Sequence, residues 1–197
     1  MNHIEISGIL EFLRSAERLK DTIRSAHTSE GRVESVAEHT WRLCLMAMLL
    51  ADSYPELDML KLLKLCIIHD LGEAVSGDIP AIHQVPGVDK SIEERQDFLS
   101  LVAPLPEKQK LELIGLWDEY DQAQTAEAKL AKALDKLETV LQHTQGKNPA
   151  DFDYGFNIPY GKKWTDFDPL TRQIRAIIDE ETKNLGLANR SYSDSIY

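Results

Sequence analysis

Residues 67–80 read IIHDLGEAVSGDIP and end an apolar run with a cluster of polar side chains. His69 and Asp70 stand side by side at the end of that run, and Glu73 and Asp78 follow shortly after. Residues three and four apart on a helix share a face, so His69, Asp70 and Glu73 are expected to reach one point beyond the helix surface. The stretch therefore predicts a helix with a group of chemically active side chains at its end.

The rest of the chain repeats the helical pattern. Apolar residues recur at helical spacing nearly everywhere, and no stretch of four to eight residues alternates convincingly as a strand would. Ser35 and Glu38 have the capping-box spacing, and they mark the start of a core helix that Pro55 closes. Further helices are expected over roughly 57–74, 91–102, 106–121, 125–145 and 169–185. The sequence predicts an all-α protein, folded as a single compact multi-helix bundle.

A chain of 197 residues is long enough for one domain with a full hydrophobic core. We expect this domain to span residues 1–185, with a motif core at about 10–145 and a C-terminal loop and helix at 150–185. The polar residues 186–197 are expected to form a flexible tail.

The net negative charge of the chain disfavours binding to nucleic acids and to anionic membranes. Asp and Glu number 33 against 22 Lys and Arg, a net charge of −11 that repels nucleic-acid backbones and anionic lipid surfaces. The longest apolar run, Leu43–Ala51, has nine residues, whereas a membrane span needs about 20. The first residues form an amphipathic pattern rather than a signal peptide. We expect a cytoplasmic protein that binds neither nucleic-acid polymers nor membranes.

Two further residues extend the polar cluster. His39 lies on the inward stripe of the helix that follows Ser35, and Asp135 borders the apolar arc of the helix at 125–145. Asp135 is expected to be the only carboxylate of its helix so close to the buried side. A single core histidine or helix-edge aspartate is more often structural, but two histidines and two aspartates together suit a divalent ion such as Mn, Co, Fe or Zn.

The order of these residues resembles the H…HD…D signature of HD-domain metal-dependent phosphohydrolases. The segments ESVAEHTWRL, IIHDLGEAVSGDIP and LWDEYDQAQTAEAKLAKALDKLE are similar to the corresponding segments of HD-domain 5′-nucleotidases, over about residues 10–145. The resemblance implies a metal-dependent phosphomonoesterase that hydrolyses nucleoside 5′-monophosphates to nucleoside and phosphate.

The resemblance also implies roles for the clustered residues. One divalent metal ion would be ligated by His39, His69, Asp70 and Asp135. Glu73 would serve the attacking water, which must lose a proton as it attacks the phosphorus atom.

The substrate contacts follow from the same resemblance. Arg24 aligns with an arginine that contacts the phosphate, which a guanidinium can do with two parallel hydrogen bonds, although Lys20 or Arg32 could replace or assist it. Asp78 either helps to hold the sugar or stabilises a turn. Ser25 occupies a position where the deoxynucleotide-selective branch of the family carries a tryptophan.

Several alternatives stay open at this point. The protein could be an HD phosphohydrolase acting on another nucleotide derivative or small phosphoester, or a non-catalytic, metal-stabilised binding or regulatory module. Members of this family are commonly homodimers, so a homodimer is expected. His27 or His83 could assist a second metal, His143 is expected at the surface, and the aromatic segment 152–168 could stack on a base or only pin a loop.

Overall fold

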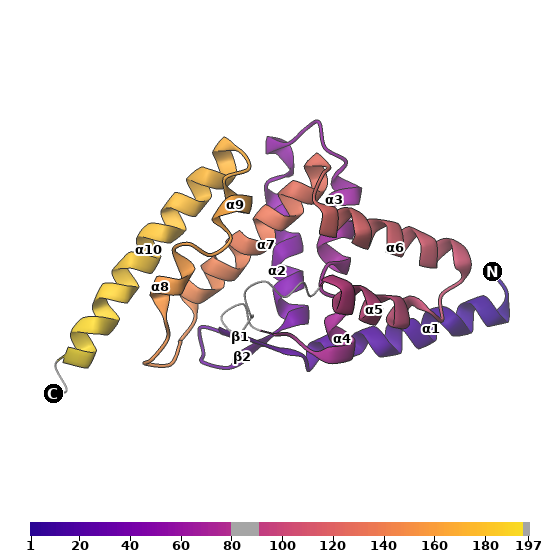
Figure 1. Cartoon of the computed structure of the whole chain (residues 1–197), viewed down its shortest axis with the longest axis horizontal. Coiled ribbons are helices and arrows are strands. Elements are labelled where there is room, and N and C mark those ends of the chain that lie inside the picture. The colour runs from indigo at the N-terminus through magenta and orange to yellow at the C-terminus, as the bar shows by residue number, and fades with distance from the viewer. Residues whose placement is uncertain (80–90, 195–197) are drawn as a thin grey trace.

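The computed structural model describes residues 1–79 and 91–194 and shows a predominantly helical molecule (Figure 1). The α-helices are α1 (His3–Ala16), α2 (Val36–Leu49), α3 (Met59–Ile68), α4 (Glu73–Ser76), α5 (Ser91–Val102), α6 (Glu107–Gln122), α7 (Ala126–Gln145), α8 (Tyr154–Asn157), α9 (Lys162–Thr165) and α10 (Pro169–Asp194). Two 3₁₀ turns, η1 (Glu17–Lys20) and η2 (Ala51–Ser53), and two strands, β1 (Ile23–His27) and β2 (Val33–Ser35), complete the described part.

Helix α7 is the centre of the fold. It packs against α2, α3, α6, α9, α10 and β1, and it crosses the middle of the molecule with α10 on one side and α2 and α3 on the other (Figure 1). Leu130, Leu134, Leu137 and Val140 on this helix are fully buried. Because so many elements share α7, a side chain on its buried face can meet residues from distant parts of the sequence.

The start of α2 forms as the sequence predicts. The Ser35 hydroxyl accepts from the backbone N–H of Glu38 at 3.3 Å, and the Glu38 carboxylate accepts from the backbone N–H of Ser35 at 2.9 Å. These two bonds satisfy backbone donors that a helix start leaves unpaired. The cap fixes the register of the helix that carries His39.

The helix expected over 57–74 is interrupted. Helix α3 ends at Ile68, a turn follows, and α4 begins at Glu73. Gly72 lies in this turn, where a Cβ atom would come within 2.9 Å of the Glu94 carbonyl oxygen of α5. The turn thus depends on a residue without a side chain, and it leaves His69 and Asp70 at the end of α3 instead of within a continuous helix.

The two strands were not expected from the sequence. They form an antiparallel hairpin in which Ile23 pairs with Ser35 and His27 pairs with Val33. The hairpin turns at Gly31, whose φ of 86° favours glycine. Strands of five and three residues with several polar side chains are too short to give a clear alternating pattern.

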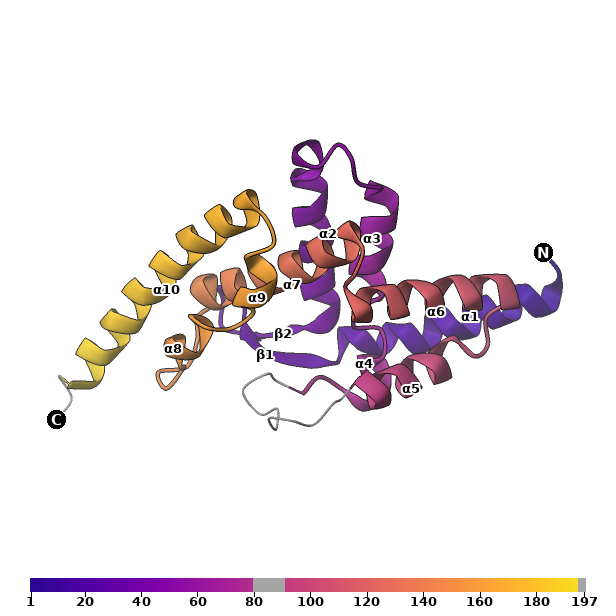
Figure 2. The ribbon, with the colours of Figure 1, turned by 45° about the horizontal axis from the view of Figure 1, so that its top comes forward.

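The C-terminal part differs from the expectation at its end. Helix α10 continues from Pro169 to Asp194, so the tail expected from residue 186 is helical as far as it is described. On α10, Arg175 donates to the backbone carbonyls of Asn157 at 2.6 Å, Ile158 at 3.0 Å and Tyr160 at 2.7 Å. Helix α8 packs against α10 and α9 packs against α7, as Figure 2 shows. Over residues 1–79 and 91–194 no helix is both long and apolar enough to span a membrane.

Replacing Ser35 with alanine should lower the free energy of unfolding by about 0.5–2 kcal/mol, because the first turn of α2 loses its side-chain cap. Urea denaturation followed by circular dichroism measures the change. Asn2→Ala is the matched control, since Asn2 forms the same capping box at the exposed start of α1. A loss from Ser35→Ala no larger than that from Asn2→Ala would contradict a special role for the α2 cap.

Candidate active site

Four residues from three parts of the fold meet beside α7. His39 comes from α2, His69 and Asp70 follow the end of α3, and Asp135 comes from α7. Possible ligand atoms of His39, His69 and Asp70 all lie within 4.8 Å of one another. The Asp135 Oδ1 atom lies 3.3 Å from Nε2 of His39 and 4.0 Å from Nε2 of His69. The structure therefore brings together the four residues that the resemblance singles out.

Each histidine turns one buried ring nitrogen toward the carboxylates. Nε2 of His69 lies 2.9 Å from Asp70 Oδ2 and Nε2 of His39 lies 3.3 Å from Asp135 Oδ1, and neither contact has hydrogen-bond geometry. The His69 Nδ1 atom lies 2.8 Å from the Cys66 carbonyl oxygen, which can only accept, so Nδ1 carries the proton and Nε2 offers its lone pair. Two buried imidazole nitrogens that face two carboxylates form a donor set that fits a divalent cation.

Glu138 supports His39 from behind. Its carboxylate accepts from His39 Nδ1, and Arg42 Nε donates to its other oxygen at 2.6 Å. Glu138 is fully buried, so the expectation that Asp135 is the only carboxylate near the buried side of α7 is wrong. Glu138 stands one helical turn after Asp135, and that spacing was the available sequence signal. A carboxylate behind a ligating histidine fixes its tautomer and orientation.

Asp135 is held in its ionised form. Tyr120 donates to its Oδ2 atom at 3.0 Å, and Lys136 Nζ lies 2.8 Å from the same oxygen. Burial alone would raise the pKa of Asp135, but Lys136 and His39 lower this pKa well below its ordinary value. The carboxylate is therefore charged, as a metal ligand must be.

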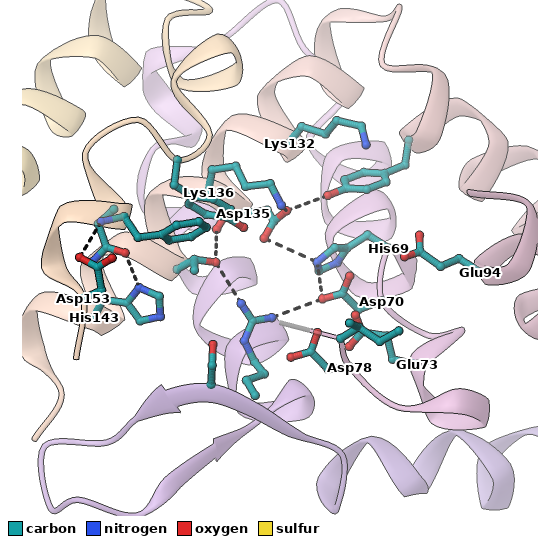
Figure 3. A pocket seen from close by; sticks show the side chains of 18 of the residues that line it. His69, Asp70, Glu73, Asp78, Glu94, Lys132, Asp135, Lys136, His143 and Asp153 are labelled. Carbon is teal, nitrogen blue, oxygen red and sulfur yellow. Dashed lines mark hydrogen bonds and ion pairs between the residues drawn. The ribbon is translucent and has the colours of Figure 1, made fainter. Parts of the chain in front are cut away.

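Glu73 and Asp78 lie beside this cluster. Figure 3 shows both side chains on the same side of Asp70, and both line the cavity that contains His69 and Asp135. The Glu73 Oε2 atom is buried and has no hydrogen-bond partner in the described part. Burial, followed by the negative charges of Asp70 and Asp78, raises the pKa of Glu73. A cation bound next to Asp70 would offset this repulsion and favour the ionised form.

Arg24 brings a positive charge to the same place from β1. Its Nη2 donates to Thr139 Oγ1 at 3.0 Å, and its Nη1 lies 3.6 Å from Asp70 Oδ2. On its other side, Arg24 Nε lies 3.6 Å from Oε2 of Glu34, a buried carboxylate of β2 that the sequence analysis did not single out. The guanidinium thus lies between Thr139 and Asp70 on one side and Glu34 of the hairpin on the other.

The two alternative cations lie elsewhere. Lys20 pairs with Glu17 at 3.4 Å, and Arg32 donates to Glu38 at 2.6 Å; all four side chains are exposed. Neither Lys20 nor Arg32 lines the cavity, whereas Arg24 does. Of the three candidates, Arg24 is the one that the structure places in the site.

The cavity has a volume of about 420 Å³ and extends from the histidines to the aromatic segment. Ser25 lines it, as do Phe152, Phe156 and Tyr160. His143, which was expected at the surface, is buried and also lines the cavity. No local pattern predicts this burial, because residues 152–160 cover His143 only through tertiary packing.

The candidates for a second metal are not in this cluster. Among the described residues, the group that could hold an ion consists of His39, His69 and Asp70. His27 lies on β1 and is not a member of it. His83 lies outside the described residues, and the idea that it assists a second metal stays untested.

Comparisons with known proteins agree with this geometry. The sequence profile of the HD domain family matches residues 16–175, and the chain belongs to that family. A human protein named 5′-deoxynucleotidase HDDC2 is 34% identical over 140 residues, which cover 70% of this chain and 68% of that protein. The Xenopus laevis protein of the same name is 31% identical over 161 residues, which cover 79% of each chain.

A solved structure gives the same result for the fold. It is described as a predicted metal-dependent phosphohydrolase from Magnetospirillum magnetotacticum, with 27% sequence identity and a TM-score of 0.77. The match covers 92% of this chain and 97% of the other. The all-α fold expected from the sequence is confirmed, and a divalent metal ion is the cofactor that the family and the histidine cluster indicate.

Glu138→Gln should weaken divalent-metal binding by about 10- to 100-fold, because His39 loses the charged partner that orients it. Isothermal titration with Mn²⁺ or Co²⁺ measures the dissociation constant. Glu112→Gln is the control, since Glu112 also pairs with a cation, Lys64, but at the exposed surface. Equal metal affinities for Glu138→Gln and the wild type would show that Glu138 does not support the site.

Proposed function

We propose that the protein is a metal-dependent phosphomonoesterase that hydrolyses nucleoside 5′-monophosphates to nucleoside and phosphate. The observation that carries this proposal is the pair of buried histidine nitrogens that face the carboxylates of Asp70, at 2.9 Å, and Asp135, at 3.3 Å. The relatives named 5′-deoxynucleotidase support a nucleotide 5′-phosphate as substrate. The chain is accordingly a hydrolase, and the nucleotide is its small-molecule partner.

In this proposal one divalent ion is held by His39, His69, Asp70 and Asp135. The donor set of two imidazoles and two carboxylates suits Mn, Co, Fe or Zn. When bound, such an ion lowers the pKa of a coordinated water and offsets negative charge on the phosphate.

The remaining residues of the site act around that ion. Glu73 accepts the proton of the attacking water, because its carboxylate is buried close to Asp70 and its Oε2 atom makes no hydrogen bond with the described residues. Arg24 binds phosphoryl oxygens from the β1 side. Asp78 lines the cavity next to Glu73 and accepts a hydrogen bond from a sugar hydroxyl.

Two other functions fit the site less well. A non-catalytic, metal-stabilised module would have no use for Glu73, a buried carboxyl whose Oε2 makes no hydrogen bond within the described chain. Another small phosphoester could reach the metal, but the cavity of about 420 Å³ with aromatic and polar walls has room for a nucleoside as well.

Glu73→Gln should lower kcat by about 10²- to 10⁴-fold while metal content and melting temperature stay near wild type, because only the proton acceptor is lost. Phosphate release from a panel of nucleoside 5′-monophosphates, each assayed with Mn²⁺, Co²⁺, Fe²⁺ and Zn²⁺, measures the activity. Glu93→Gln, at a neighbouring exposed glutamate, is the control. Release of no phosphate from any nucleotide by the metal-loaded wild type would refute the proposed function.

Ser25 should leave room for a ribose 2′-hydroxyl. It lines the cavity one residue after Arg24, and a small polar side chain gives neither a steric wall nor an unmet polar group. We expect kcat/KM for AMP and dAMP to agree within about tenfold, a difference below about 1.4 kcal/mol. Ser25→Trp should depress AMP turnover more than dAMP turnover, and equal effects would show that Ser25 does not border the sugar. Trp41 is a bulky side chain that could form such a wall in place of residue 25, but it is exposed and lies outside the cavity lining.

A homodimer belongs to the same proposal. Helix α1 exposes Ile4, Leu10 and Leu13, and no residue of this helix is fully buried. A second copy of the chain would cover such a face. Light scattering should give a particle of twice 22.3 kDa at micromolar concentration, and a particle of 22.3 kDa would contradict the dimer. The cytoplasmic location stays a prediction.

A further inference from the structure

Helix α7 contributes a second cation to the cavity. Lys132, Asp135 and Lys136 are three and four residues apart, so they share one face of the helix, and all three line the cavity. Lys136 is neutralised, because its Nζ lies 2.8 Å from Asp135 Oδ2. Lys132 makes no ion pair with any residue that the structure describes, and its Nζ lies over the rings of Tyr120, at 4.2 Å, and Trp164, at 5.3 Å.

The charge on Lys132 is poorly compensated where it lies. Burial, followed by the positive charge of Lys136, lowers the pKa of Lys132. Aromatic faces attract a cation but do not neutralise it. A chain with a net charge of −11 has many carboxylates that could pair with a lysine. An unpaired lysine on a cavity wall is therefore suited to an anionic ligand that enters the cavity.

Tyr120 connects Lys132 to the metal cluster. The ring centroid of Tyr120 lies 5.2 Å from that of His69, and its hydroxyl donates to Asp135. Figure 3 shows Lys132 above His69, on the opposite side from Asp78 and Glu73. Arg24 reaches the cluster from β1, so the two cations approach from different elements.

We propose that Lys132 binds the phosphate of the substrate and of the inorganic phosphate product, opposite Arg24. This inference rests on the proposed function for the identity of the substrate. A phosphomonoester carries two negative charges on three equivalent oxygens, and Arg24 can engage only some of them. The lysine stem is flexible enough for Nζ to exchange the aromatic rings for a phosphoryl oxygen. No bond is made or broken by Lys132, which acts as a charge that binds substrate and product.

The test compares Lys132→Met with Lys129→Met. Methionine keeps an unbranched stem of similar length against Tyr120 and Trp164 but removes the charge. Lys129 is on the same helix, is exposed, and does not line the cavity, so its variant removes an equal charge from the protein without touching the site. The probe is inorganic phosphate, titrated into the Mn²⁺-loaded full-length proteins and followed by calorimetry.

Lys132→Met should bind phosphate about 10- to 100-fold more weakly than wild type, the loss expected for one charge-assisted hydrogen bond. Lys129→Met should bind it like wild type, and Lys132→Arg should lose clearly less than Lys132→Met. Inhibition of turnover by the free nucleoside should be unchanged in Lys132→Met, because the nucleoside has no phosphate. Unchanged phosphate affinity, or an equal loss in both methionine variants, would overturn the proposal.

A measurement on the wild type covers the case in which Lys132→Met does not fold. Saturating phosphate should slow acetylation of Lys132 by acetic anhydride, measured by mass spectrometry, and leave the acetylation of Lys129 unchanged. No protection of Lys132 would contradict the inference. Because phosphate binding is read without any nucleotide, failure of the nucleotidase function would appear separately, as an absence of turnover in the wild type.

Discussion

The negative charges buried on α7 constrain the rest of the structure. Asp135 and Glu138 are almost fully removed from water, and an isolated buried carboxylate is costly. Each makes contacts with other elements: Tyr120 on α6 donates to Asp135, whose charge is offset by Lys136, and Arg42 and His39 on α2 contact Glu138. These contacts fix the position of α2 and α6 against α7, and the two histidine Nε2 atoms face the carboxylates of Asp70 and Asp135 at the place where a cation would complete the charge balance.

Much of the helical fold could be predicted because it is local. The capping box at Ser35 and the apolar periodicity of α5, α6 and α7 depend only on residues that are close together in the sequence. These helices form close to where the pattern predicts them. The hairpin and the break after Ile68 could not be predicted in this way. The hairpin depends on pairing short polar strands, and the break depends on the close approach of Gly72 to α5, which is a tertiary contact.

The residues of the candidate site also fall into those that the sequence indicates and those that only tertiary contacts reveal. His39, His69, Asp70 and Asp135 could be named from their order, since the resemblance rests on that order. His143 and Lys132 could not, because their roles depend on the segment 152–160 and on two aromatic rings. The spacing of Glu138 places it on the same face as Asp135, but its role depends on the contact with His39. A glutamate or lysine on a helix is usually solvated, and only the packing of α2, α6 and α9 shows that these are not.

Hydrogen bonds from Arg175 hold the main chain of residues 157–160, which form the cavity wall near the aromatic segment. This guanidinium donates to the carbonyls of Asn157, Ile158 and Tyr160 and not to their side chains. Side chains on that wall can therefore be exchanged while the path of the chain is kept, and the metal cluster, built from α2, α3 and α7, would be left intact. The metal cluster and the cavity wall at residues 157–160 are thus built from different parts of the chain. Substitutions in that wall could change which substrates the cavity accepts without altering the metal cluster.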